Sequence, residues 1–475
     1  MPQFSNLAAS LPDDIWKWHA WQIAGAIRHG HISSREAVKS CLQRIENINP
    51  LINALSGINA EAALRMADAA DEAVKGGRVL GQLHGVPVTI KCNVDVKGQA
   101  TTNGVAARVN LIATENSPVV DNLLAGGAVI VGRSNAPTFA MRWFTDNKLH
   151  GRTLNPWNDA LTPGGSSGGA GAAVAAGMCP IGHGNDIGGS IRYPAYACGV
   201  YGLRPTVGRI PAYVPSAGDV KPFTFQQFAV QGPITRCVRD LRLSLDVMCK
   251  GDLRDPDWSP TPFKGAALAR PIKVALVDEI SEVPIAQEVR GALSQAASWL
   301  VDEGFVVEKS VPPGLYEAMR LWLTLVMTDL RPGVGPLIEQ SGDGDAIRAL
   351  NSMYAYVGQV SLESFVKAFA LRNGLRRKWN EFFDEYPVIL MPTSLQLPFS
   401  YDADLGGDHA MARIIEAQLP LLATSALNYP CVSVPTGLYQ GKPVGVQIVT
   451  GSFREDLCLH IAEKIESHAR MPNVF

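Results

Sequence analysis

Two glycine-rich stretches that each contain serine lie close together in the chain: Thr-Pro-Gly-Gly-Ser-Ser-Gly-Gly at residues 162–169 and Gly-Asn-Asp-Ile-Gly-Gly-Ser-Ile-Arg at residues 184–192. Upstream of both, residues 86–91 read Val-Pro-Val-Thr-Ile-Lys. Apolar residues alternate along this third stretch, which predicts a half-buried strand that ends at Lys91. Together the three stretches offer serine hydroxyls, a candidate base and unshielded backbone N–H groups. They therefore indicate a reaction carried out by an activated serine.

The candidate base is Lys91. A serine hydroxyl is a poor nucleophile until a base removes its proton. Lys91 can act in this way only as the neutral amine, and the reference pKa of lysine is about 10.4. Burial disfavours the ammonium form. Because Lys91 ends an apolar strand that enters the core, we expect desolvation to lower its pKa.

The segment around Ser190 has the features of a site for negative charge. The preceding apolar stretch predicts a short strand, and residues 191–197 predict the start of a helix. Two glycines directly before Ser190 allow a tight turn and leave the backbone N–H groups unshielded. N–H groups at a helix N-terminus favour an anion, such as the oxyanion of a tetrahedral intermediate. Asp186 and Arg192 flank the serine, and we expect them to form a structural ion pair that holds the turn.

These segments resemble the amidase signature family, in which a lysine, a serine held by a cis peptide bond and a nucleophilic serine form the catalytic triad. The resemblance implies that Lys91 is the base, that Ser166 passes the proton between Ser190 and Lys91, and that Ser190 is the nucleophile that forms an acyl-enzyme. It also implies an oxyanion hole made of four backbone N–H groups, those of Ile187, Gly188, Gly189 and Ser190.

The resemblance covers nearly the whole chain. Further family motifs follow in order, at residues 202–209, 232–236, 428–430, 434–437 and 441–447. The implied fold is a single α/β/α domain over residues 1–475, with a mixed central β-sheet covered by helices. Its core motifs lie in residues 80–240, and a variable segment that covers the substrate lies at about residues 310–410.

The hydrophobic pattern also predicts alternating strands and helices, which favours a sheet with helices on both faces. A capping box at residues 33–36 starts a helix whose apolar residues recur at helical spacing. Further along the chain, strands are predicted at residues 128–131, 272–277, 305–308, 388–391, 431–434 and 444–450, and helices at residues 287–301 and 455–468.

Two groups of apolar residues bear on the substrate. Met141, Trp143 and Phe144 are expected to line the substrate pocket, although such a stretch fits packed core equally well. A second set is expected to cover the site: Trp322, Met327, Met353, Tyr354, Tyr356, Phe365 and Phe369. Both sets suggest an uncharged, bulky, aryl substrate. Residues 142–147 and 150–157 resemble a subgroup of bacterial-type amidases that includes urethanases, so the expected substrates are small amides, with aryl amides and aryl carbamates among them.

Three positions depart from the family pattern. Cys92 and Asn93 follow the lysine, where many members have an acidic residue. Thr138 stands where the aminoacyl-tRNA amidotransferase A-type subunits of the family usually have glutamate. The departure at position 138 favours a free-standing amidase, and an amidotransferase subunit that needs partners is the alternative function.

Other functions fit the sequence less well. Residues 164–168 match G-x-S-x-G, the nucleophile elbow of α/β-hydrolases, with Ser166 attacking. An elbow follows a strand, however, and residues 155–164 predict a loop. A phosphate-binding loop is excluded because Ala170, not lysine, follows Gly169. An inactive family member is a further alternative. The presence of all three triad residues argues against it.

The composition is that of an ordinary globular enzyme, with 475 residues, 47% hydrophobic and 18% charged. A net charge of −2 suggests no nucleic-acid partner, and the chain has no apolar run of about 18 residues that would predict a membrane span. No H-E-x-x-H or paired C-x-x-C motif indicates a metal, and no cofactor is expected. The eight cysteines are scattered, which predicts reduced thiols in a cytoplasmic protein. The expected partner is a small-molecule amide or carbamate substrate, and the expected assembly is a monomer or homodimer.

Overall fold

The structure, a computed structural model, describes residues 11–218, 220–268, 271–469, 471–472 and 474. Eleven strands lie in these residues: β1 (Leu55–Gly57), β2 (Pro87–Lys91), β3 (Val129–Ser134), β4 (Ile181–Asp186), β5 (Tyr201–Arg204), β6 (Val230–Thr235), β7 (Lys273–Leu276), β8 (Val306–Lys309), β9 (Val388–Pro392), β10 (Cys431–Tyr439) and β11 (Lys442–Thr450). They form one sheet in the order β1-β3-β2-β4-β6-β5-β10-β11-β9-β7-β8.

The sheet is mixed, as predicted. Strand β2 runs parallel to β3 and β4, and β7 runs parallel to β8 and β9. The strands between these two groups pair in antiparallel fashion. Two parallel groups are therefore joined by an antiparallel centre.

Sixteen α-helices lie in the described residues: α2 (Ala20–Arg28), α3 (Ser34–Ile52), α4 (Ala60–Lys75), α5 (Pro118–Ala125), α6 (Gly168–Ala175), α7 (Arg192–Cys198), α8 (Phe223–Phe228), α9 (Val238–Met248), α10 (Gln287–Asp302), α11 (Leu315–Leu330), α12 (Val334–Gln340), α13 (Gly344–Val357), α14 (Leu362–Glu385), α15 (Asp408–Ala417), α16 (Leu419–Leu427) and α17 (Glu455–His468). Short 3₁₀ turns are η1 (Ile15–Lys17), η2 (Ala106–Arg108), η3 (Thr138–Ala140), η4 (Pro215–Ala217) and η5 (Ala403–Leu405).

Helices cover both faces of the sheet because alternate strand residues point to opposite sides. Val88 and Ile90 of β2 belong to a core that also contains residues of α2, α5, α9, α10 and α17. Val129 and Val131 of β3 point the other way, into a core with α3, α4, α6 and α7. A third core holds α11, α13 and α16 against the remaining part of that second face.

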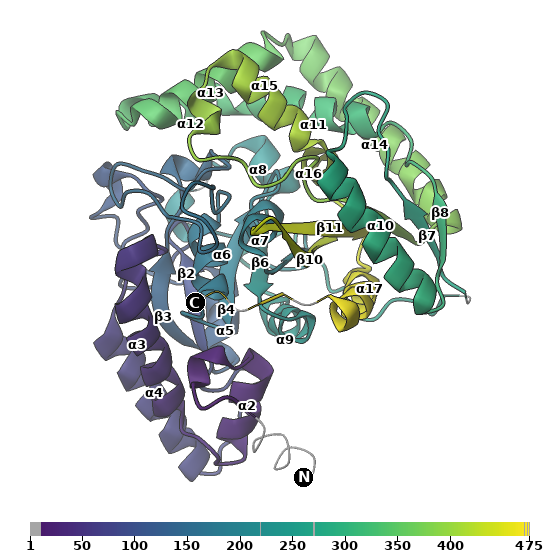
Figure 1. The fold of residues 1–475 in the computed structure, drawn as a ribbon. Coiled ribbons are helices and arrows are strands. Elements are labelled where there is room, and N and C mark those ends of the chain that lie inside the picture. The colour runs from purple at the N-terminus through teal and green to yellow at the C-terminus, as the bar shows by residue number, and fades with distance from the viewer. Residues whose placement is uncertain (1–10, 219, 269–270, 470, 473, 475) are drawn as a thin grey trace.

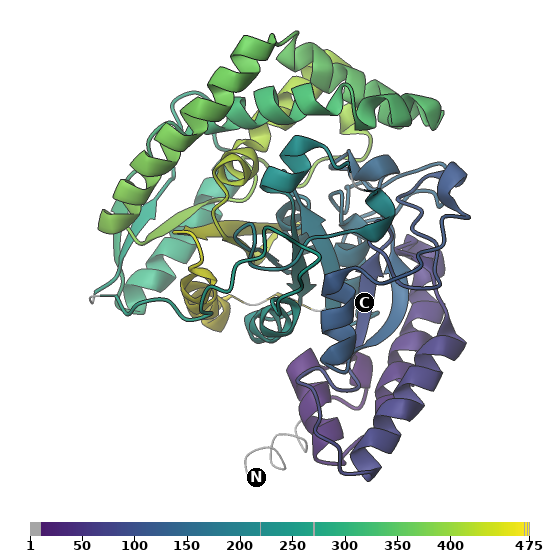
Figure 2. The same cartoon turned by 180° about the vertical axis from the view of Figure 1, so that it is seen from behind.

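Helices α11 to α15 gather into a layer above the body of the molecule (Figure 1). Seen from behind, the same layer arches over the sheet, and α14 forms its long outer edge (Figure 2). This layer comes from residues 315–417 and so includes most of the segment that the sequence predicts to cover the substrate.

The predicted elements are found with small shifts at their ends. Ser33 caps α3 through the expected capping box, with Glu36 as the reciprocal partner. The last helix spans the predicted residues 455–468. Strands β10 and β11 extend further than the apolar pattern, because they pair as a hairpin whose outer end is held by backbone hydrogen bonds rather than by burial.

Two neighbouring parallel strands bring Lys91 and Asp186 to the same edge of the sheet. Strand β2 ends at Lys91 and its partner β4 ends at Asp186. Carboxyl ends of adjacent parallel strands lie at the same edge of a sheet, which is where α/β folds bind ligands. Helices α6 and α7, which follow the two serine stretches, pack against each other beside this edge.

Candidate active site

Lys91 lies at the centre of the candidate site. It is the last residue of β2 and is completely buried. Its Nζ atom lies 2.7 Å from Ser166 Oγ and 2.8 Å from Asn185 Oδ1. Burial lowers the pKa of Lys91 to about 7, against the smaller raising effects of Cys92 and Asp186. A large fraction of the lysine is therefore the neutral amine near neutral pH.

Ser166 is held in a fixed loop directly before α6. The Gly165–Ser166 peptide bond is cis, which is the geometry that the family resemblance implies. The glycines before the serine are required by close packing, because a Cβ atom at Gly165 would collide with the backbone of residues 142–144. Gly164 has φ +81°, in the left-handed region that favours glycine. The loop therefore presents the Ser166 hydroxyl to Lys91 without side chains in between.

Ser190 lies two residues before α7, is 7% exposed and lines a pocket. Its carbonyl accepts a hydrogen bond from the backbone N–H of Ser167 at 3.2 Å. The two serine stretches, separate in the sequence, are joined by this contact.

Asp186 organises the turn that precedes Ser190. It forms a buried ion pair with Arg192 at 3.0 Å and a longer one with Arg204 at 3.5 Å. Burial by itself would raise the pKa of Asp186, but the two guanidinium groups hold it well below its usual range. Its carboxylate oxygens also accept the backbone N–H groups of Gly189 at 2.8 Å and Ile191 at 3.0 Å. Asp186 and Arg192 thus lie in the arrangement that the sequence predicts for them.

The contact with Asp186 bears on the predicted oxyanion hole. Because the Gly189 N–H donates to Asp186, its hydrogen is directed away from an incoming ligand. The N–H groups of Ile187, Gly188 and Ser190 are left as the candidate donors for negative charge that develops beside Ser190.

Sequence reasoning did not single out Asn185, and it noted Asn93 only as a departure from the family pattern. Asn185 Oδ1 accepts a hydrogen bond from Lys91, and Asn185 Nδ2 donates to Asn93 Oδ1 at 2.9 Å. The second bond fixes which end of the Asn185 amide faces the lysine. If Asn185 Oδ1 takes one N–H of neutral Lys91, the lone pair of Nζ is free to accept the Ser166 hydroxyl proton. Only the spatial neighbourhood identifies this pair, because asparagine beside a glycine turn is common in any loop.

Replacing Asn185 by aspartate should lower the fraction of Lys91 that is the neutral amine at neutral pH. A carboxylate at the position of Oδ1 would favour the ammonium form and raise the pKa of Lys91 by about 1–3 units. The rate at which a fluorophosphonate labels Ser190 rises with pH. The midpoint of this rise should lie at a higher pH in Asn185→Asp than in the unaltered protein, by the same amount as the pKa of Lys91 is raised. Asn93→Asp, one hydrogen bond further from Lys91, is the matched control and should shift the profile less. Equal profiles for Asn185→Asp and the unaltered protein would contradict this role.

A narrow apolar pocket opens at Ser190. Its lining residues are Ala140, Met141, Arg142, Trp143, Ile187, Gly188, Ser190, Phe225, Trp322, Val326 and Met353. The volume of this cavity is about 30 Å³, which is enough to admit water. The walls come from the loop after η3, from α8, and from α11 and α13 of the helical layer.

The sequence-predicted pocket residues divide into two groups. Met141 and Trp143 line the pocket, as do Trp322 and Met353 from the predicted covering set. Phe144 does not line it: the side chain is fully buried and stacks on Phe399 with ring centroids 6.1 Å apart. Trp143 and Phe144 lie in a bend of the chain, and the first contacts the pocket while the second packs into the core. Phe225 is a lining residue that sequence reasoning missed.

Arg142 is the charged residue of the pocket lining, and its positive charge is neutralised by Asp404. Its guanidinium forms a bidentate pair with Asp404, at 2.7 and 2.9 Å, and both side chains are almost completely buried. A bidentate pair of this kind satisfies both charges. The pocket is therefore presented to a ligand as an uncharged, aromatic and methionine-rich surface.

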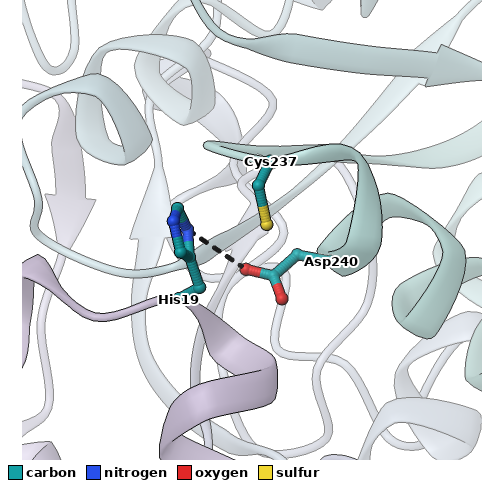
Figure 3. Close-up of side chains that lie close together, drawn as sticks. All are labelled: His19, Cys237 and Asp240. Carbon is teal, nitrogen blue, oxygen red and sulfur yellow. Dashed lines mark ion pairs between the residues drawn. The ribbon is translucent and has the colours of Figure 1, made fainter. Parts of the chain in front are cut away.

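A cluster of metal-type donors lies elsewhere in the described residues, formed by His19, Cys237 and Asp240 (Figure 3). Asp240 accepts the backbone N–H groups of Ala20 at 2.7 Å and Trp21 at 2.9 Å, which are the first-turn donors of α2. Burial and the nearby Arg236 lower the pKa of His19 to about 4. We interpret the cluster as a helix cap supplied by a distant carboxylate.

No helix in the described part of the chain combines the length and the apolar character needed to cross a membrane. The eight cysteines are free thiols, and all except Cys249 are buried.

The chain matches known proteins over nearly its whole length. The family model described as Amidase matches residues 36–459. An indoleacetamide hydrolase of Bradyrhizobium diazoefficiens is 41% identical over 96% of this chain and 87% of its own length. An acylamidase of Rhodococcus erythropolis is 31% identical, covering 94% of this chain and 94% of its own length. A solved structure of a bacterial aryl acylamidase of the amidase signature enzymes gives a TM-score of 0.82 at 26% identity, covering 95% of this chain and 96% of that chain.

The mixed sheet covered by helices is the fold of the amidase signature enzymes. The chain belongs to the amidase family. It is an amide-hydrolysing enzyme, and the fold expected from the family resemblance is confirmed.

Proposed function

We propose that this protein hydrolyses the C–N bond of small amides whose acyl group carries a flat aromatic ring. The acyl group is transferred to Ser190 in the first half of the reaction. The observation that carries this proposal is the uncharged aromatic pocket that opens directly at Ser190, beside the Lys91–Ser166 hydrogen bond.

In the proposed first half, neutral Lys91 draws the proton of Ser166, and Ser166 in turn draws the proton of Ser190. The Ser190 oxygen attacks the amide carbon, and the carbonyl oxygen becomes an oxyanion that accepts hydrogen bonds from the N–H groups of Ile187, Gly188 and Ser190. The tetrahedral intermediate collapses when the C–N bond breaks and the leaving nitrogen takes the proton back through Ser166. For a primary amide the departing amine is ammonia.

In the second half, water takes the place of the amine. Lys91 and Ser166 remove a proton from the water as it attacks the acyl ester on Ser190. The ester bond breaks, Ser190 recovers its proton, and a carboxylic acid leaves. The pKa of Lys91 near 7 fits both directions of transfer, because such a group gains and loses a proton readily at neutral pH.

The lining of the pocket supports an aromatic acyl group. Trp143, Trp322 and Phe225 supply ring faces, and Met141 and Met353 supply flexible side chains. The free volume of about 30 Å³ is too small for an aromatic ring, so binding requires side chains to move. Methionine has three rotatable bonds and adapts in this way. The relative that shares 41% identity is named for hydrolysis of indoleacetamide, an amide with such a ring.

The substrate test compares arylacetamides with acetamide. A ring that leaves water for an apolar wall gains about 2–3 kcal/mol, which is about 30- to 150-fold in kcat/KM. We expect indole-3-acetamide and 2-phenylacetamide to exceed acetamide by that factor when ammonia release is measured. Phe225→Ala should reduce the preference. Phe223→Ala is the matched control, because Phe223 lies on the same short helix but is 39% exposed and outside the pocket.

The outcomes separate the candidate functions. Turnover confined to acetamide and other short aliphatic amides would contradict the aryl preference. Faster turnover of an aryl carbamate, such as ethyl N-phenylcarbamate, would replace the amide by a carbamate as the preferred substrate. No turnover by the isolated chain, with turnover restored by amidotransferase partners, would establish the amidotransferase role instead. Against that role, Thr138 at the position of the expected glutamate is engaged in the fold, where its hydroxyl donates to Asp343 at 2.5 Å.

A further inference from the structure

We propose that Trp322 and Trp143 are positioning residues that hold the oxyanion loop, residues 187–190, in its working conformation while they also form walls of the acyl pocket. This inference rests on the proposed function of Ser190. It adds two side chains to the machinery, one from the helical layer and one from the loop after η3. It also predicts how recognition of the acyl ring is connected to the rate of the chemical step.

The contacts are specific for the indole N–H groups. Trp322 Nε1 donates to the carbonyl of Ile187 at 2.7 Å, and Trp143 Nε1 donates to the carbonyl of Gly188 at 3.0 Å. The Trp322 ring also packs on Gly188, where a Cβ atom would come within 2.6 Å of the ring carbon Cζ2. Trp322 is 3% exposed and Trp143 is 6% exposed. Two consecutive peptide groups are thus each held by one indole.

Holding a carbonyl fixes the N–H on the other side of the same peptide group. A trans peptide unit is planar, so its C=O and N–H point in opposite directions. The bond from Trp322 therefore sets the direction of the Gly188 N–H, which is one of the candidate oxyanion donors. The bond from Trp143 sets the direction of the Gly189 N–H, which donates to Asp186. Trp143 and Asp186 hold this peptide from its two ends.

Glycine makes such support necessary. Residues 188 and 189 have no side chains that would limit their backbone angles, and Gly189 has φ +101°. Hydrogen bonds in a row also polarise each other, so an indole on the carbonyl strengthens the N–H as a donor. In a site largely closed to water, donors held in place before the reaction stabilise the oxyanion without reorganising.

The same two rings meet the substrate. Both line the pocket in which the proposed acyl ring lies. A ring that stacks on them limits their motion, and hence the motion of the loop that they hold. Binding energy from the aromatic group is then expressed in kcat as well as in KM, because it supports an interaction that is strongest in the transition state.

The test removes the N–H and keeps a ring, with Trp322→Phe and Trp143→Phe. Trp379→Phe is the matched control, since Trp379 is fully buried and donates to the carbonyl of Pro313 at 2.8 Å, outside the pocket. We expect kcat on 2-phenylacetamide to fall about tenfold or more in each test variant, with KM changed by less than about threefold. The rate of Ser190 labelling by a fluorophosphonate, whose phosphoryl oxygen uses the same donors, should fall by a similar factor. The control should change both rates by less than about twofold.

A second variant and a second measurement allow the inference to be tested even if the first variants fail to fold or the proposed substrate is wrong. If a phenylalanine variant does not fold, β-(3-benzothienyl)alanine at position 322 keeps the shape of the indole and replaces only the N–H by sulfur. Unchanged kcat and labelling rate, or a rise in KM alone, would overturn the inference and leave the indoles as pocket walls. Labelling does not require amide turnover, so an enzyme that labels at Ser190 but cleaves no arylacetamide would refute the proposed substrate and still test the two tryptophans.

Discussion

Replacing Ser190 by alanine is expected to lower kcat on an arylacetamide by at least about 10⁴-fold. Without the hydroxyl no acyl-enzyme can form, and loss of a serine nucleophile elsewhere costs about 10⁶-fold in kcat. The substitution removes one oxygen atom from a residue that is 7% exposed, so the thermal unfolding temperature should change by only a few degrees. Ammonia release under single-turnover conditions measures the effect.

Ser166 and Ser167 provide an internal control for this loss. Ser166 hydrogen-bonds Lys91, whereas Ser167 Oγ faces the backbone carbonyl of Asn185 at 3.3 Å. Ser166→Ala should therefore lower kcat by about 10²-fold or more, in the range of general acid–base contributions. Ser167→Ala should lower it by less than tenfold. If Ser190→Ala retained the activity of the unaltered protein, the assignment of the nucleophile would be wrong.

Lys91→Met is expected to lower kcat/KM by about 10³-fold and to abolish its dependence on pH near neutrality. Methionine fills the volume of the lysine chain but cannot accept a proton. In the unaltered protein the base is active only when deprotonated, and burial lowers the pKa of Lys91 to about 7. The rate should therefore be level above pH 7 and fall about tenfold for each pH unit below it.

A pH–rate profile of kcat/KM on the free enzyme measures this prediction, because it reports the pKa of groups in the unbound protein. A profile in Lys91→Met that keeps the acid limb near pH 7 would show that another group is titrating. His183 is not expected to be that group. Burial, and to a smaller extent Lys91, lowers the pKa of His183 to about 3, so this histidine does not titrate near neutral pH.

Local sequence signals were sufficient for much of the fold. The alternation of Val86, Val88 and Ile90 marks a strand, although β2 is buried on both faces and not half-buried as predicted, because helices cover both sides of the sheet. The capping box at Ser33 and Glu36 marks the start of a helix. These signals arise from contacts between residues near in sequence. The family resemblance added the mixed topology, which depends on how distant strands pair and which no local pattern specifies.

The candidate site shows where sequence reasoning ends. Lys91, Ser166 and Ser190 could be named because each lies in a recognisable motif, and Asp186 and Arg192 because they flank the nucleophile. Asn185 acts through a side chain placed by the pairing of β2 with β4. Phe225 reaches the pocket from α8, and Trp322, expected only as part of the covering set, also donates to the carbonyl of Ile187. Their roles depend on tertiary packing, and an aromatic residue on a helix is otherwise typical of core.

Phe144 and Asp240 also show that sequence reasoning does not identify the contact partners of a residue. Phe144 follows directly after Trp143, yet it packs in the core against Phe399 while Trp143 lines the pocket. Asp240 has no sequence pattern that links it to Ala20, although its carboxylate caps the helix that begins there. In both cases the type of residue was visible in the sequence and the partner was not.

The most direct test of the Ser190–Ser166–Lys91 arrangement is fluorophosphonate labelling followed by peptide mass mapping, with Lys91→Met treated in parallel. The account predicts one adduct, on Ser190, whose formation slows by a factor of about 10³ in the lysine variant. An adduct on Ser166, or equal labelling of Ser190 in both proteins, would contradict it.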